Sequence, residues 1–324
     1  MTDSPQLTLN SLFEALDGCE DRHRRTLQDD VGRLMLGAGS RYAAEVEGFL
    51  SLYRRDAALA PILDPLISEI RDYALWLRWL GWNIAALGPP LYGSSGVAID
   101  ALAFGLLAYA AGRLIDDGFD NHESYKGRHP SLVGTLRGRI AGAPTYRACV
   151  QSVFVGFSLF HYALRRMRQA DHCDWADQVS RLFDALSVGV VAEGLLVAPV
   201  GVDVYHQVIR RKSVAYNLIL YKTFLAPLKP ALRGELLRTL AEMDELAQLV
   251  NDYVDLNEDV LAGTLNALTF GVYHRVDLES VILSKATAAW MATESLNESV
   301  RDAMAVMIRS VLSPYRERVV SNAV

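Results

Sequence analysis

The sequence contains few cysteines and no excess of basic residues. Its three cysteines, Cys19, Cys149 and Cys173, are an odd set whose spacings match neither a zinc site nor a disulfide framework, which indicates free thiols in a reducing compartment. Basic residues number 32 against 38 acidic ones, a net charge of -6. Because nucleic-acid phosphates call for a basic face, this balance argues against a nucleic-acid partner.

The motifs of several common enzyme classes are absent as well. The chain has no GxxxxGK[ST] phosphate loop, no HExxH, no GxSxG elbow and no GxGxxG. The N-terminal stretch lacks the basic start and apolar run of a signal peptide. Asp100 and Arg113 interrupt the longest apolar run before it reaches the ~20 residues of a membrane span. We therefore expect a cytoplasmic protein without a membrane span.

Hydrophobic residues, in contrast, are plentiful and recur with helical spacing. They make up 51% of the 324 residues, enough for a large core. In residues 235–259 they recur at steps of three and four, which keeps them on one helical face, and no run alternates by two as a strand would. We predict an all-α fold, a helical bundle of about ten or more helices, with residues 1–25 as a frayed N-terminal segment and residues 26–324 as a single domain.

Three aspartates stand at the end of a strongly apolar segment. Residues 98–115 are apolar nearly all round, which is typical of a helix buried inside a bundle, and Asp116, Asp117 and Asp120 follow directly. Asp116 and Asp120 are four residues apart, so on a continuing helix they share one face. Such carboxylates are costly unless a cation compensates them, and oxygen ligands of this kind suit Mg²⁺. The alternative is an acidic helix end that faces solvent.

A second acidic cluster, NDYVDLNED, ends the amphipathic segment described above. Asn251, Asp255 and Asp259 are spaced i, i+4 and i+8, which predicts that they lie on one face of a single long helix. Six oxygen-bearing side chains from two helices would then face each other across the core, as metal ligands do in helical bundles. A calcium-binding loop is excluded, because Val260 stands where its glycine is needed and Asn266 where its bidentate glutamate is needed.

A group of three basic residues, Arg210, Arg211 and Lys212, lies between the two acidic clusters inside an otherwise apolar segment. Taken alone, it is equally well explained as a solvated helix face. Beside two metal-binding clusters, capture of a phosphate group by one or two of these cations is the better interpretation.

These motifs resemble those of the trans-isoprenyl diphosphate synthase fold and its class I terpene synthase relatives. DDGFD is similar to the first aspartate-rich motif, DDxxD. NDYVDLNED resembles the second, which is DDxxD in chain-elongating synthases and NDxxSxxxE in terpene cyclases. VIRRKSVAYNL looks like the segment whose lysine, here Lys212, binds diphosphate, and YKGRHPS is similar to the RRGxP of elongating enzymes, with Lys126 or Arg128 as its remnant.

The resemblance implies a deep apolar pocket and three Mg²⁺ ions, held by Asp116, Asp117, Asp120, Asn251, Asp255 and Asp259. The ions would bridge these residues to an allylic prenyl diphosphate, whose departure leaves a carbocation. Metal ions with Arg and Lys make diphosphate a better leaving group by neutralising its charge. The resemblance also leaves room for a homodimer.

One departure from the family pattern favours cyclisation over chain elongation. The GGKRxR element, which holds isopentenyl diphosphate upstream of the first motif, is missing, and Trp76 and Trp79 occupy this region three residues apart. Their rings would stabilise a carbocation by cation–π attraction, with ordinary core packing as the alternative. The second motif is a hybrid, because Asn251 matches cyclases whereas Asp255 and Asp259 do not.

The residues one turn before Asp116 bear on the length of the substrate. Ala111 and Gly112 are small where relatives that accept shorter chains carry bulky rings, so the pocket is expected to stay open below them unless a neighbouring helix fills the gap. We assign both, together with Tyr109, to the substrate pocket and favour geranylgeranyl diphosphate over farnesyl diphosphate.

The sequence thus predicts a Mg²⁺-dependent class I terpene synthase that ionises and cyclises a linear allylic diphosphate. The alternative is a prenyltransferase, which either elongates with isopentenyl diphosphate or prenylates another acceptor. A third interpretation is a non-catalytic partner subunit of a prenyl synthase, which need not keep its metal ligands.

Overall fold

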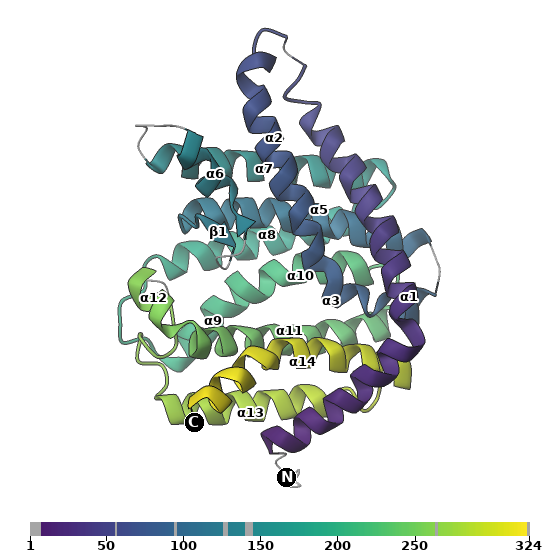
Figure 1. The fold of residues 1–324 in the computed structure, drawn as a ribbon, viewed down its shortest axis with the longest axis vertical. Helices are drawn as coiled ribbons and strands as arrows, with labels where there is room; N and C mark the ends of the chain where they lie inside the picture. The colour runs from purple at the N-terminus through teal and green to yellow at the C-terminus, as the bar shows by residue number, and fades with distance from the viewer. Residues whose placement is uncertain are drawn as a thin grey trace.

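The helices of this chain form an all-α bundle (Figure 1). The computed structural model describes residues 8–55, 57–93, 96–125, 129–139, 145–262 and 265–322. Its longer helices are α1 (Leu9–Leu50), α2 (Ala60–Leu77), α5 (Gly96–Phe119), α7 (Thr145–Gln169), α8 (Cys173–Glu193), α10 (Ala215–Leu225), α11 (Pro230–Val254), α13 (Arg275–Met291) and α14 (Glu298–Asn322). The prediction of an all-α bundle of ten or more helices is confirmed.

Shorter elements connect these helices. They are η1 (Arg78–Gly81), α3 (Trp82–Ala85), α4 (Gly88–Tyr92), α6 (Leu132–Arg139), α9 (Val202–Ile209), η2 (Arg210–Val214) and α12 (Leu256–Ala262). The two-residue strands β1 (Ser124–Tyr125) and β2 (His129–Pro130) pair antiparallel as a small hairpin directly after α5. Of these connections, the π-helical turn η2 matters most for the site, because it carries all three residues of the basic group.

Helix α5 lies at the centre of the bundle and packs against α1, α7 and α10. Its side chains are apolar nearly all round, and 16 of its 24 residues are buried. Among the described residues it is the one helix long and apolar enough to cross a membrane, yet 78% of that window is buried inside the bundle. This is the environment of a core helix, as the sequence pattern predicts.

Helix α1 runs along one side of the bundle and packs against α14 and α5 (Figure 1). It begins where the Thr8 side chain accepts a hydrogen bond from the Ser11 N–H group, and Leu12, Phe13 and Leu16 are buried in its first turns. Arg22 donates to Asp302 of α14 at 2.7 Å. The boundary expected at residue 25 therefore falls inside one continuous, packed helix, and the division of the chain into a terminal segment and one domain stays a prediction.

Candidate active site

A cavity of about 910 Å³ lies where the C-terminal ends of α5, α8 and α11 meet η2. Its apolar wall is formed by Ile115, Phe119, Phe157, Phe183, Leu186, Val190, Val191, Val208, Ile209 and Leu265. Among the described residues, six acidic side chains, one arginine, one lysine and one histidine line it: Asp116, Asp120, Glu123, Glu193, Asp255, Asp259, Arg113, Lys212 and His122. The charged part of the cavity is therefore mainly acidic, the rest of its wall combines apolar with uncharged polar side chains, and its volume is typical of a small-molecule site.

Asp116 and Asp120 of the first cluster both line the cavity, as their spacing predicts. The Asp120 N–H group donates to the Asp116 carbonyl at 2.9 Å, so the helical turn continues as far as Asp120 although α5 ends one residue earlier. Burial raises the pKa of Asp120, and the neighbouring Asp116 raises it further, against the opposing effect of Lys212. The pair therefore offers oxygen ligands to a cation from one face of the helix.

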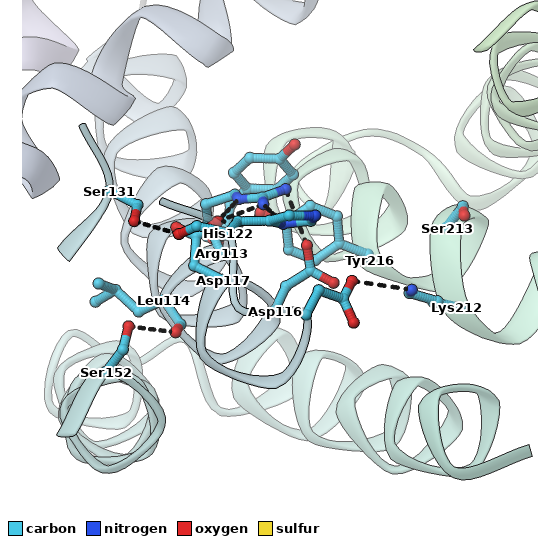
Figure 2. Close-up of polar contacts among 12 residues, drawn as sticks. Arg113, Leu114, Asp116, Asp117, His122, Ser131, Ser152, Lys212, Ser213 and Tyr216 are labelled. Atoms are coloured by element: carbon cyan, nitrogen blue, oxygen red, sulfur yellow. Dashed lines mark hydrogen bonds and ion pairs between the residues drawn. The ribbon is translucent and has the colours of Figure 1, made fainter. Parts of the chain in front are cut away.

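Asp117 lies on the other side of the same turn and is fully buried. Its carboxylate accepts a hydrogen bond from Arg113 Nε at 2.8 Å, and Figure 2 shows the two side chains together. It also accepts from the Tyr73 hydroxyl at 2.5 Å. Burial alone would raise the pKa of Asp117, but the nearby His122 ring and the hydrogen bonds from Arg113 and Tyr73 outweigh it and lower the pKa. Asp117 is thus a buried, ion-paired carboxylate outside the described cavity lining, whereas the sequence analysis placed it with the metal ligands.

Arg113 is the cation that compensates these carboxylates, and sequence reasoning missed it. Its Nη1 lies 2.9 Å from Asp116 Oδ2, and its Nη2 also contacts Asp117. Ligand atoms of Asp116, Asp117 and His122 lie within 4.8 Å of one another, so this guanidinium borders a group that would otherwise be a candidate cation site. The available signal was the i+3 and i+4 spacing of Arg113 to the two aspartates, in a segment whose only other charged residue before them is Asp100.

The second cluster departs from the predicted single helix. Helix α11 ends at Val254, Asp255 follows it as a bend, and Asp259 belongs to the next helix, α12. The expectation that Asn251, Asp255 and Asp259 share one face of one continuous helix is therefore wrong. All three nevertheless line the cavity. The Asp255 N–H group donates to the Asn251 carbonyl at 2.7 Å and the Asp259 N–H group to the Asp255 carbonyl at 3.0 Å, so helical i, i+4 contacts continue across the bend.

A buried asparagine explains this break. Asn266 Nδ2 donates to the Asp252 carbonyl at 2.8 Å, taking the acceptor that an uninterrupted α-helix would offer to residue 256, and it also donates to Asp259 Oδ2 at 2.7 Å. The Asp252 side chain accepts from the Tyr205 hydroxyl and the Ala267 N–H group, each at 2.6 Å. Burial raises the pKa of Asp252 to about 7. Neither Asn266 nor Asp252 was among the predicted site residues.

Of the three basic residues in η2, Lys212 alone belongs to the described cavity lining. Its Nζ lies 3.3 Å from Asp120 Oδ2 and 2.5 Å from Glu193 Oε2, and Figure 2 shows it pointing toward the end of α5. Burial alone would lower the pKa of Lys212, but the surrounding carboxylates raise it, so the ammonium group stays charged. Arg211 is exposed, and Arg210 donates instead to the buried Glu245 of α11.

A close helix contact positions Lys212. A Cβ atom on Gly189 of α8 would lie 2.6 Å from the Lys212 backbone nitrogen, so only glycine allows α8 and η2 to approach this closely. One turn later on α8, Glu193 lies beside the Lys212 ammonium. Glu193 is thus a further cavity residue that the sequence analysis did not identify.

The remaining candidates lie elsewhere or outside the described residues. Lys126 and Arg128 are outside the described residues. Trp76 stacks on His129 with ring centroids 4.5 Å apart, and Trp79 is 53% exposed. Neither tryptophan is among the described residues that line the cavity, whose aromatic side chains are instead Tyr109, Phe119, Phe157, Phe183 and Tyr216.

The gap expected beside Ala111 and Gly112 is filled by neighbouring helices. A Cβ atom on Gly112 would lie 2.6 Å from the ring of Tyr216 on α10, and the Tyr216 and Tyr109 ring centroids are 4.2 Å apart. Ala111 is buried outside the described lining, and a Cβ atom on Gly156 of α7 would lie 2.8 Å from its carbonyl oxygen. Of the two small residues, Gly112 lines the cavity, where the Tyr109 and Tyr216 rings form part of the wall, whereas Ala111 lies outside the described lining.

Comparison with known proteins shows similarity of fold. No protein-family model and no curated protein matches the sequence. A geranylgeranyl pyrophosphate synthase from Corynebacterium glutamicum, solved with isoprenyl diphosphate and magnesium, matches at a TM-score of 0.60 and 14% identity over 85% of this chain and 98% of its own. A decaprenyl diphosphate synthase from Rhodobacter capsulatus matches at a TM-score of 0.57 and 15% identity. The match covers 91% of this chain and 98% of the synthase.

A polyprenyl synthase from Caulobacter crescentus, solved with calcium and isoprenyl diphosphate, matches at a TM-score of 0.56 and 15% identity over 90% of this chain and 97% of its own. All three structural relatives are nearly fully covered by the chain. The chain therefore has the isoprenoid synthase fold, with structural matches to trans-prenyl diphosphate synthases at low identity.

Proposed function

We propose that the protein is a Mg²⁺-dependent enzyme that removes diphosphate from an allylic prenyl diphosphate. The observation that supports this most is that the two acidic clusters, Lys212 and an apolar wall line one cavity. The isoprenoid synthase fold supports the same assignment, since two of the solved relatives hold isoprenyl diphosphate with magnesium or calcium.

The donor set of the cavity fits Mg²⁺. Carboxylate and amide oxygens are the ligands that this hard cation prefers, and six acidic lining residues stand against one arginine and one lysine. The residues that would hold it are Asp116, Asp120, Asn251, Asp255 and Asp259, and the resemblance puts the number of ions at three. Bound Mg²⁺ would supply Lewis-acid neutralisation of the diphosphate.

The protein's own side chains account for substrate binding. Lys212 offers a charged ammonium group to the diphosphate at the polar end of the cavity. The prenyl chain would extend along the apolar wall, where the rings of Phe183, Tyr109 and Tyr216 stabilise positive charge by cation–π attraction and keep water away. Geranylgeranyl diphosphate stays the favoured substrate, although the Tyr216 ring limits the space beside Gly112.

The fate of the carbocation has two candidates. Prenyl transfer is supported by the structural relatives, which are prenyl diphosphate synthases. Cyclisation of a single substrate is supported by the cavity, because its described lining holds only two lysine or arginine side chains, Lys212 and Arg113, and a second diphosphate needs cations of its own. A cytoplasmic location and a homodimer accompany both candidates as predictions.

One assay separates the candidates. Purified protein with Mg²⁺ is incubated with geranyl, farnesyl or geranylgeranyl diphosphate, each with and without isopentenyl diphosphate, and extracts are analysed by gas chromatography with mass detection before and after phosphatase. A hydrocarbon or alcohol formed without isopentenyl diphosphate and without phosphatase identifies a cyclase. A longer prenyl alcohol that is detected only when isopentenyl diphosphate is present and the product has been treated with phosphatase identifies chain elongation.

Two variants test the site within the same assay. Asp120→Asn and Asn251→Ala each remove a metal ligand from one cluster, and each is expected to lower turnover at least about 100-fold, because loss of one electrostatic contact to the transition state costs this much. Arg168→Gln, an exposed pair partner of Asp177, serves as control and keeps wild-type turnover. Full activity of both cluster variants, or no turnover of any allylic diphosphate by the wild type, contradicts the proposal.

A further inference from the structure

Arg113 contacts the buried Asp117, Asp116 at the cavity wall and, through Nη2, His122 Nδ1 at 2.9 Å. Its side chain is 13% exposed and lines the cavity. On one side it donates to Asp117, which is fully buried and is also held by the Tyr73 hydroxyl. On the other side its Nη1 lies 2.9 Å from Asp116 Oδ2, on the wall where substrate would bind. The guanidinium is therefore anchored at its back and presents a donor at its front.

Each cavity-facing aspartate of the first cluster is paired with one cation. Arg113 holds Asp116 from α5 itself, and Lys212 holds Asp120 from η2, at 2.9 and 3.3 Å. A metal ion that binds these carboxylates competes with both cations for the same oxygen atoms. A guanidinium donor that loses its carboxylate inside a largely buried site needs another acceptor, since unpaired buried donors are costly.

We propose that Arg113 is a diphosphate-binding residue, which exchanges its Nη1 contact with Asp116 for a phosphate oxygen when Mg²⁺ binds the first cluster. This inference rests on the proposed function. The planar fork of arginine suits the role, because its Nε and Nη2 donors remain on Asp117 while Nη1 contacts the ligand. Arg210 does not compete for it, because its Nε donates to Glu245 and it lies outside the described lining.

The test measures binding rather than turnover. Isothermal titration calorimetry gives the affinity of the protein for Mg²⁺ alone and for inorganic diphosphate at saturating Mg²⁺. Arg113→Gln removes the competing charge, so we expect it to bind Mg²⁺ more tightly than the wild type, and to bind diphosphate at least about 10-fold more weakly because a charge-assisted contact is lost. Arg168→Gln on the surface is the matched control and leaves both affinities unchanged.

A second variant covers the case in which Arg113→Gln leaves Asp117 unpaired and unfolds the protein. Arg113→Lys keeps a positive charge beside Asp117, so we expect a melting temperature near that of the wild type. A lysine ammonium lacks the rigid fork of arginine and cannot contact Asp117 and a phosphate with separate fixed donors, so we expect at least about fivefold weaker diphosphate binding. Diphosphate affinity within twofold of wild type in a folded Arg113 variant overturns the inference and leaves Arg113 as a counter-ion only. Failure of the wild type to bind Mg²⁺ or diphosphate at all contradicts the proposed function instead.

Discussion

Asp244 is a buried carboxyl group that has no cation beside it among the described residues, and it gives a quantitative prediction for stability. It lies on α11 and is 3% exposed. Its Oδ1 accepts from Asn217 Nδ2 at 3.1 Å and from the Tyr221 hydroxyl at 3.2 Å, and its Oδ2 has no hydrogen-bond partner among the described residues. Burial raises the pKa of Asp244 well above that of a free carboxyl group, because the two hydrogen bonds only partly offset the cost of charging it.

The raised pKa links Asp244 to the pH dependence of stability. The folded protein holds this proton more tightly than the unfolded chain, where the pKa is about 3.9. As the pH rises above that value, the unfolded chain loses the proton first, so stability is lost until the pH reaches the folded pKa. One such group changes the free energy of unfolding by at most about 1.4 kcal/mol per pH unit, or about 2.7 kcal/mol between pH 5 and pH 7.

Asp244→Asn isolates this contribution. Asparagine stays neutral, has nearly the same shape and can accept the same hydrogen bonds from Asn217 and Tyr221. Urea unfolding followed by circular dichroism at pH 5, 6 and 7 gives the free energy of unfolding of both proteins. We expect the difference, variant minus wild type, to rise with pH, with about 1.4 kcal/mol per unit as the upper limit of the slope for one proton.

A stability difference that stays constant between pH 5 and pH 7 would refute this reasoning. It would mean that Asp244 gains and loses its proton alike in the folded and unfolded chains. Asp177→Asn, at a side chain that is 61% exposed, is the matched control for the loss of a surface carboxylate.

Three further predictions concern the site and its surroundings. Tyr73→Phe removes a hydrogen bond to the buried Asp117 carboxylate, so urea unfolding should show a loss of about 1.5–3 kcal/mol, and an unchanged stability would contradict the contact. Gly112→Val forces the Tyr216 ring aside and should lower turnover of geranylgeranyl diphosphate more than that of geranyl diphosphate; equal effects would exclude a role in chain length. Phe154 on α7 is 68% exposed, and if the predicted homodimer buries it, Phe154→Asp should yield monomers by light scattering, whereas a monomeric wild type would contradict the dimer.

The helical spacing of the sequence was sufficient to predict the fold class and part of the site. An apolar stretch without a polar face can be stable only inside a bundle, and α5 is buried there. The i, i+4 spacing of Asp116 and Asp120 brings both to the cavity, because that turn remains helical. Lys212 also reaches the cavity, as the resemblance implied.

Contacts between distant segments decided the rest. Asp117 turns away from the cavity because Tyr73, 44 residues earlier, supplies a buried donor. Asn266, beyond the end of α11, takes the Asp252 carbonyl and so ends the helix before Asp255. Trp76 finds its stacking partner in His129 rather than in the cavity.

Periodicity determines which residues of one helix lie together, because it depends only on the repeat of the backbone. The sequence alone thus determined the all-α bundle, its buried central helix and the position of Asp116 and Asp120 on one face of that helix. Which buried donor meets which carboxylate depends on helices far apart in the chain, and only the tertiary structure brings them together. That is why the sequence called for a cation beside the aspartates, whereas the structure was needed to identify it as Arg113.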